Sequence, residues 1–157
     1  MKAATINELK KELSTLNPNE VEDLCMRLAR FKKENKELLT YLLFEAHNEQ
    51  TYIESVKEEI DKGFSEINQS NLYFVKKSLR KILRVTNKFL RYSGSKTTAI
   101  EVLIYYCKKL KDSGIPYHKS QMILNIYEGQ LKKINLLIKG LHEDLQYDYL
   151  NEVKKIM

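Results

Sequence analysis

The chain has 157 residues, of which 43% are hydrophobic and 31% are charged, and its formal net charge is +6. A chain of this length buries about 70% of the surface that its unfolded form exposes, which is enough for a core without disulfides or metals. Only five glycines and two prolines are present. This scarcity argues against strands and tight turns and indicates a helical protein.

The N-terminal segment and the cysteines indicate a cytoplasmic protein. Residues 1–13, MKAATINELKKEL, hold no apolar stretch with a small-residue cleavage site, so we expect no secretory signal. The longest apolar run, 102–107, has six residues, whereas a membrane span needs about 20. Two lone thiols, Cys25 and Cys107, are typical of a reducing compartment, with a single disulfide as the alternative.

Helix-start signals divide the first third of the chain. Thr5 and Glu8 form the pattern of a capping box before a short helix that reaches about residue 16. Asn17 is a good N-cap and Pro18 a good first helical residue for a helix over 17–33. The next predicted helix, 35–46, is apolar nearly all round, which predicts a buried helix at the centre of the fold.

An acidic helix and a basic helix follow. Residues 50–68 have one apolar stripe and many acids on the other side, and residues 71–92 have an apolar stripe opposite a row of cations. Nine acids and three lysines give residues 34–66 a net charge of −6, and eight cations without an acid give 67–100 a net charge of +8. A turn of two or three residues joins the two helices, so we expect them to lie antiparallel.

Glycine marks the remaining boundaries. Gly94 is expected just past the end of the basic helix, and Thr98 with Glu101 predicts the cap of a helix that reaches Asp112. Residues 113–116 form a clear break, and helices over 119–139 and 141–157 complete the chain. Short turns make neighbouring helices antiparallel. The predicted fold is all-α: one domain, 1–157, built as a compact antiparallel multi-helix bundle or short α-hairpin array of about eight helices.

No pattern in the chain points to catalysis. A nucleophile elbow, a Walker loop, a dinucleotide-binding glycine pattern and a zinc-protease motif are all absent. The histidines, His47, His118 and His142, lack the spacing of metal ligands, and most carboxylates lie opposite apolar stripes, where water solvates them. We therefore expect no catalytic residues, no metal, no cofactor and no small-molecule substrate.

The basic side of the 71–92 helix is the main candidate for a functional surface. Its members are Lys76, Lys77, Arg80, Lys81, Arg84, Lys88 and Arg91. Three interpretations compete: charge pairing with the acidic helix, which fixes the packing partner; contact with the phosphates of RNA or DNA; and docking to an acidic protein or a membrane surface.

Tyrosines form the second candidate surface. Tyr105 and Tyr106 are adjacent, and one aspartate separates Tyr147 from Tyr149. Each pair therefore places one ring away from a single apolar stripe. The candidate role is an aromatic contact with a partner; the alternative is packing at the rim of the core. Together these features predict a non-catalytic helical interaction or scaffold protein that binds a protein partner or itself, with nucleic acid as the alternative ligand.

Overall fold

Helices account for all the regular structure of the protein. The computed structural model describes all 157 residues and contains eight α-helices and no strand. The helices are α1 (Ile6–Leu13), α2 (Pro18–Phe31), α3 (Lys33–Thr40), α4 (Glu49–Ser65), α5 (Leu72–Ser93), α6 (Lys96–Asp112), α7 (Gln121–Ile138) and α8 (Glu143–Ile156). A π-helical turn, Tyr41–Glu45, follows α3, and a 3₁₀ turn, Tyr117–Lys119, precedes α7. The predicted all-α fold of about eight helices is confirmed.

The chain divides into two compact units, Met1–Phe44 and Glu45–Met157, and each is described by itself. The single domain 1–157 stays a prediction. In the first unit α2 packs against α3, and the Asn35 side-chain amide donates a 2.8 Å hydrogen bond to the Leu28 carbonyl. No residue of α1, α2 or α3 is buried, and the one buried residue of Met1–Phe44 is Tyr41, which follows α3.

Side chains cap the first two helices. The Thr5 backbone N–H donates to the Glu8 carboxylate at 2.7 Å, and the Thr5 hydroxyl oxygen accepts from the Glu8 N–H at 3.3 Å. Asn17 caps α2 and exchanges the same pair of bonds with Glu20, at 3.0 and 2.9 Å. Pro18 is the first residue of α2. The predicted capping box and the predicted start of the second helix are both confirmed.

The segment that was predicted to be the central helix is not central. Regular α-helix ends at Thr40 instead of continuing to residue 46, and the π-helical turn follows. Leu42 is 56% exposed, and Leu43 and Phe44 are still more exposed. An apolar segment becomes central only where other helices cover every side of it, and the first unit offers no such cover.

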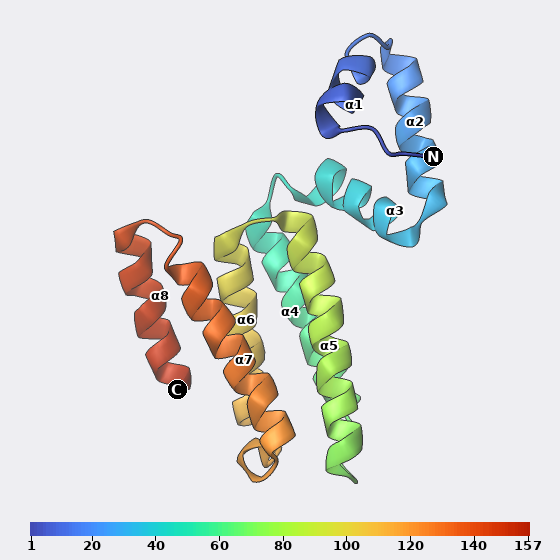
Figure 1. Ribbon diagram of the computed structural model, residues 1–157. Coiled ribbons are helices and arrows are strands. Elements are labelled where there is room, and N and C mark those ends of the chain that lie inside the picture. The colour runs from blue at the N-terminus through green and yellow to red at the C-terminus, as the bar shows by residue number, and fades with distance from the viewer. The chain divides into compact units, whose positions relative to one another are not determined.

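The centre of the second unit is α6. Figure 1 shows α4 to α8 side by side, and α6 contacts each of the other four helices. Eight of its residues are buried: Thr98, Ala99, Ile100, Val102, Leu103, Tyr106, Cys107 and Leu110. A helix with neighbours on several sides needs apolar side chains on several sides, which explains why the longest apolar run of the chain, 102–107, lies here.

The turn between α5 and α6 differs from the prediction at one point. Gly94 ends α5 with φ of +67°, as predicted for a left-handed residue at a helix end. The cap of α6, however, is Ser95, whose hydroxyl oxygen accepts from the Thr98 N–H at 3.2 Å. The buried Thr98 hydroxyl instead donates to the Glu49 carboxylate at 2.6 Å, and the Ser93 hydroxyl donates to the same oxygen. The predicted Thr98 cap is therefore wrong, because this hydroxyl ties α6 to the start of α4.

Candidate functional site

The basic face is the surface of α5 formed by the seven predicted cations, Lys76, Lys77, Arg80, Lys81, Arg84, Lys88 and Arg91. Lys76 and Lys88 are half-buried, and the other five side chains are exposed. None of those five forms an ion pair with a carboxylate. These five cations therefore form a row of positive charge that no carboxylate of the second unit neutralises.

A cap at each end of α5 and an apolar stripe along it explain why this segment is a helix that exposes its cations. The Asn71 side-chain oxygen accepts from the Tyr73 N–H at 2.8 Å and caps the first turn, and Gly94 ends the last turn. Between these ends, six residues at helical spacing face the core: Val75, Leu79, Ile82, Leu83, Thr86 and Leu90. Burial of this stripe turns the opposite side of the helix, which holds the cations, toward solvent.

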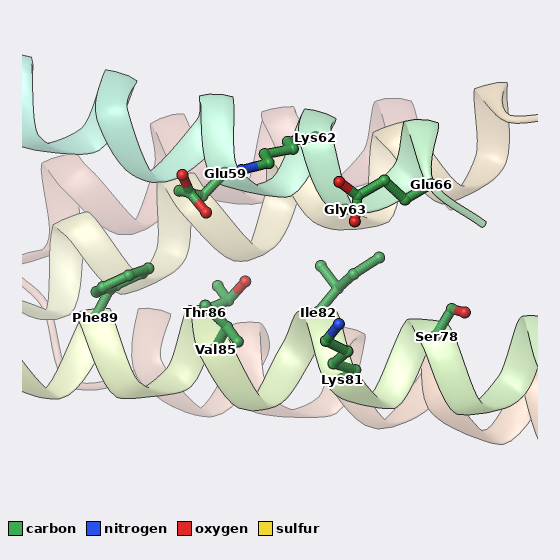
Figure 2. Close-up of a pocket in the computed structure, with 10 residues that line it drawn as sticks. All are labelled: Glu59, Lys62, Gly63, Glu66, Ser78, Lys81, Ile82, Val85, Thr86 and Phe89. Carbon is green, nitrogen blue, oxygen red and sulfur yellow. The ribbon is translucent and has the colours of Figure 1, made fainter.

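The contact between α4 and α5 is close at Gly63. Figure 2 shows Ile82 directed toward Gly63 across the two helices. A Cβ atom on Gly63 would lie 2.7 Å from Ile82 Cγ1, so only glycine allows this approach. Lys81 shares the depression between the helices with Glu59 and Glu66 but pairs with neither. The charge pairing expected along this contact is therefore not what holds these two helices together.

The basic face is slightly hollowed. A shallow depression of about 460 Å³ is lined by Tyr73, Lys76, Lys77, Arg80, Lys81 and Arg84. A second depression, of about 530 Å³, begins at Arg91 and continues between α5, α6 and α7, where Lys96 and Lys133 contribute further positive charge. Lys133 Nζ donates a 2.5 Å hydrogen bond to the Asn87 side-chain oxygen on α5. The cationic surface thus continues past the end of the predicted row.

Tyr105 is engaged inside the second unit. Its hydroxyl donates to the Asp61 carboxylate at 2.7 and 2.8 Å, and Lys109 Nζ lies 2.8 Å from the same group. Burial, followed by the hydrogen bond and the charge of Asp61, raises the pKa of Tyr105 to about 12. Burial alone would raise the pKa of Asp61, but the hydrogen bonds from Lys109 and Tyr105 and the Lys109 charge together lower it. This cluster joins α4 to α6, engages the Tyr105 hydroxyl and leaves the residue half-buried.

The other three tyrosines occupy different environments. Tyr106 is 0% exposed, packs its ring 5.5 Å from that of Phe64 and donates to the Leu79 carbonyl at 3.4 Å. The expectation that Tyr106 offers a surface contact is therefore corrected: it lies on the central helix and belongs to the core. Tyr149 is half-buried and donates to Glu101 at 3.2 Å, whereas Tyr147 is 69% exposed. Of the four candidate tyrosines, only Tyr147 is free on the surface.

Sequence reasoning missed Tyr73 as part of the basic face. This residue opens α5, is 57% exposed and lines the same depression as five of the cations. The signal was present in the spacing, because Tyr73 lies four residues before Lys77 and seven before Arg80, on one side of a helix.

Other kinds of site have little support in the structure. No group of three or more His, Cys, Asp or Glu side chains is placed to hold a metal ion. His142 caps α8, where its Nδ1 atom accepts from the Asp144 N–H at 3.5 Å. No helix combines the length and the apolar character that crossing a bilayer requires. No protein family, curated protein or solved structure matches the chain.

Proposed function

We propose that this protein is a non-catalytic interaction protein that binds an anionic macromolecule, nucleic acid in particular, through the basic face of α5. The observation that supports the proposal is that Lys77, Arg80, Lys81, Arg84 and Arg91 are exposed on one side of a single helix and form no ion pair. An extended row of unneutralised cations attracts a polyanion and gains free energy by releasing the counterions of its phosphates.

The dimensions of the face fit a chain of phosphates. From Lys77 to Arg91 the helix rises about 21 Å, at about 1.5 Å per residue. Lys77, Arg80 and Arg84 are three and four residues apart, about 4.5–6 Å along the axis, and Arg91 lies seven residues, about 10 Å, beyond Arg84. Such a row supplies contacts that position a strand and carry no base sequence. The cytoplasm is the location that we propose, since both cysteines are free thiols, as is usual in a reducing compartment.

A titration of fluorescent RNA and DNA oligonucleotides at about 50 and 200 mM salt tests the proposal. The test variant is Arg80→Glu with Arg84→Glu, and the matched control is Lys108→Glu with Lys154→Glu, two exposed lysines on α6 and α8 that form no ion pair. Both variants change the net charge equally. We expect the test variant to lose at least tenfold in affinity and to lower the salt slope by about 1.4 for a single strand, about 0.7 per contact.

Two results would contradict the proposal. One is binding weaker than about 10⁻⁴ M at low salt, the weak end of non-specific binding. The other is an equal loss of affinity in the test and control variants, which would mean that only the net charge matters.

A protein partner is the second candidate, and Tyr147 supports it. Tyr147 and Leu150 lie three residues apart on α8, and both are exposed. Tyrosine is one of the residues enriched at the centre of protein interfaces. Sedimentation of the protein over a range of concentrations, compared with Tyr147→Ala, tests self-association through this pair. A mass that stays monomeric at every concentration would exclude it.

A further inference from the structure

Tyr73 places an aromatic ring in line with the cations of the basic face. Steps of four, three and four residues lead from Tyr73 to Lys77, Arg80 and Arg84, so all four side chains project from one side of α5. The ring is 57% exposed, and its hydroxyl forms no hydrogen bond within the protein. Core packing therefore does not account for a tyrosine at this position.

Neighbouring groups contact the Tyr73 ring, with Lys76 over one of its faces, and leave the residue 57% exposed. Its backbone N–H is fixed by the Asn71 cap, and the Phe74 ring lies 5.6 Å away at an interplanar angle of 75°. Lys76 Nζ lies 5.2 Å from the centroid of the Tyr73 ring and donates to the Met122 sulfur at 3.5 Å. A ring with this support loses little conformational freedom when a flat ligand group stacks on it.

The chemistry of the ligand follows from the combination of a ring and a row of cations. Phosphates alone need only the cations, and a duplex keeps its bases stacked inside, out of reach of a ring on a helix surface. A single strand offers free bases, whose faces stack on aromatic side chains while a positively charged groove follows the backbone. Resting on the proposed function, we infer that the ligand is single-stranded nucleic acid, with one base stacked on Tyr73 and phosphates along Lys77, Arg80 and Arg84.

An anionic membrane surface is the competing ligand class. Exposed Leu72, Phe74 and Met122 lie at the same end of the basic face and are apolar. A helix that lies in a membrane interface, however, inserts a broad apolar face into the lipid. The broad apolar face of α5 is buried in the second unit, where Leu79 is 0% exposed. The structure therefore favours the single strand, and vesicle binding becomes an outcome of the test.

The test compares a strand with bases to a polyanion without them. Tyr73→Ala, Tyr73→Phe and the wild type are titrated with a fluorescent single-stranded oligonucleotide, a duplex of the same length and heparin. Stacking of one base is lost in Tyr73→Ala, so its affinity for the single strand should fall about 5- to 150-fold. Tyr73→Phe keeps the ring and should bind like the wild type, and heparin and the duplex should bind all three proteins alike.

Fluorescence gives a second readout of the stacked base. The chain contains no tryptophan, so Tyr73→Trp introduces a single reporter, and Tyr147→Trp on α8 is its matched control. A single strand should quench the fluorescence of Tyr73→Trp, because a stacked base contacts the indole. Heparin should quench neither variant, and the strand should leave Tyr147→Trp unchanged.

The outcomes separate this inference from the proposed function. If Tyr73→Ala binds the single strand normally while Arg80→Glu with Arg84→Glu does not, stacking is refuted and the proposed function stands. An equal loss for strand and heparin also refutes stacking. If no oligonucleotide binds the wild type, both fail, and binding to phosphatidylserine vesicles instead would assign the face to membranes. Unchanged thermal unfolding of Tyr73→Ala, expected for an exposed residue, confirms that the variant is folded.

Discussion

Substitution of Gly63 by alanine tests how closely α4 and α5 approach, and hence how α5 is held. In an open helix, Gly→Ala stabilises by up to about 1 kcal/mol, because alanine restricts the unfolded chain. At Gly63 the new methyl group would lie 2.7 Å from Ile82 Cγ1 and 3.1 Å from Cδ1. Ile82 is branched at Cβ and nearly buried, so it does not move aside easily.

The expected sign follows from these two effects. Inserting a methyl group into a packed contact costs about 1–3 kcal/mol, which exceeds the gain in helix propensity. Gly63→Ala should therefore lower the free energy of unfolding by about 0–2 kcal/mol. The matched control is Gly129→Ala in α7, where a Cβ atom meets nothing within 4 Å. It should raise the free energy of unfolding by up to about 1 kcal/mol.

A double substitution isolates the contact. Ile82→Ala removes the two atoms in the way and leaves only Cβ, at 3.7 Å. It costs about 2–5 kcal/mol by itself, but within that background Gly63→Ala should become stabilising, which gives a coupling energy of about 1–3 kcal/mol. Urea unfolding followed by circular dichroism measures all four proteins. If Gly63→Ala stabilises the wild type as much as Gly129→Ala does, the close approach of the helices is refuted.

Three further predictions concern the fold. Leu79→Ala should cost about 2–5 kcal/mol and Leu42→Ala less than about 1 kcal/mol, because the first side chain is fully buried and the second is mostly exposed, and urea unfolding measures both. Gly94→Ala should cost about 1–2 kcal/mol by the same measurement, since φ of +67° is unfavourable for any residue with a Cβ atom. The hydrogen bond between Asp61 and Tyr105 should make stability fall at both extremes of pH. The pKa of Asp61 is lower in the folded than in the unfolded chain, so Asp61 stabilises the fold at a pH above its unfolded pKa, and this stabilisation is lost as the pH falls through the folded pKa. The pKa of Tyr105 is raised to about 12, so Tyr105 stabilises the fold at a pH below its unfolded pKa of about 10, and this stabilisation is lost as the pH rises toward about 12. An alkaline titration of tyrosinate absorbance, compared between wild type and Tyr105→Phe, should show this late step, and Asp61→Asn should move it to lower pH.

Local signals in the sequence were sufficient for most helices and for several of their ends. Thr5, Asn17, Asn71 and Gly94 act through bonds or dihedral angles within four residues of themselves, so their roles are readable without knowledge of the fold. Ser95 shows the limit of this reasoning. Two hydroxyls compete to cap α6, and Glu49, which is 49 residues from Thr98, engages the second of them.

Neighbours in space were not predictable in the same way. The apolar segment 35–46 and the apolar run 102–107 both favour burial, but only the second lies among four other helices. The number of neighbouring helices also explains why Tyr106 is buried. On a helix with one apolar stripe, adjacent tyrosines place one ring in solvent, whereas on α6 Tyr106 enters the core and Tyr105 bonds to Asp61.

The rotation of α5 about its axis follows from a comparison of two free energies. An exposed ion pair contributes about 0–1 kcal/mol, whereas burial of a leucine side chain contributes about 1.5–3 kcal/mol. Turning α5 so that Arg80 and Arg84 met the acids of α4 would lift core leucines such as Leu79 and Leu83 toward solvent. Two ion pairs would gain at most about 2 kcal/mol and two leucines would lose about 3–6 kcal/mol. The core stripe therefore sets the rotation, and it leaves Arg80 and Arg84 without an ion pair.

Arg80 and Arg84 therefore contribute nothing favourable to the stability of the fold. Arg80 and Arg84 are neighbours of like charge four residues apart, and such pairs destabilise a helix by about 0.2–0.5 kcal/mol. Arg80→Glu with Arg84→Glu exchanges one like-charge pair for another, but it also places each new carboxylate three or four residues from lysines of α5, namely Lys76, Lys77, Lys81 and Lys88. The free energy of unfolding should therefore stay level or rise slightly, while the affinity for nucleic acid falls at least tenfold. A loss of more than about 1 kcal/mol, beyond the usual range for exposed positions, would show that these cations support the fold. A row of charges that weakens its own helix is better explained by a ligand than by packing.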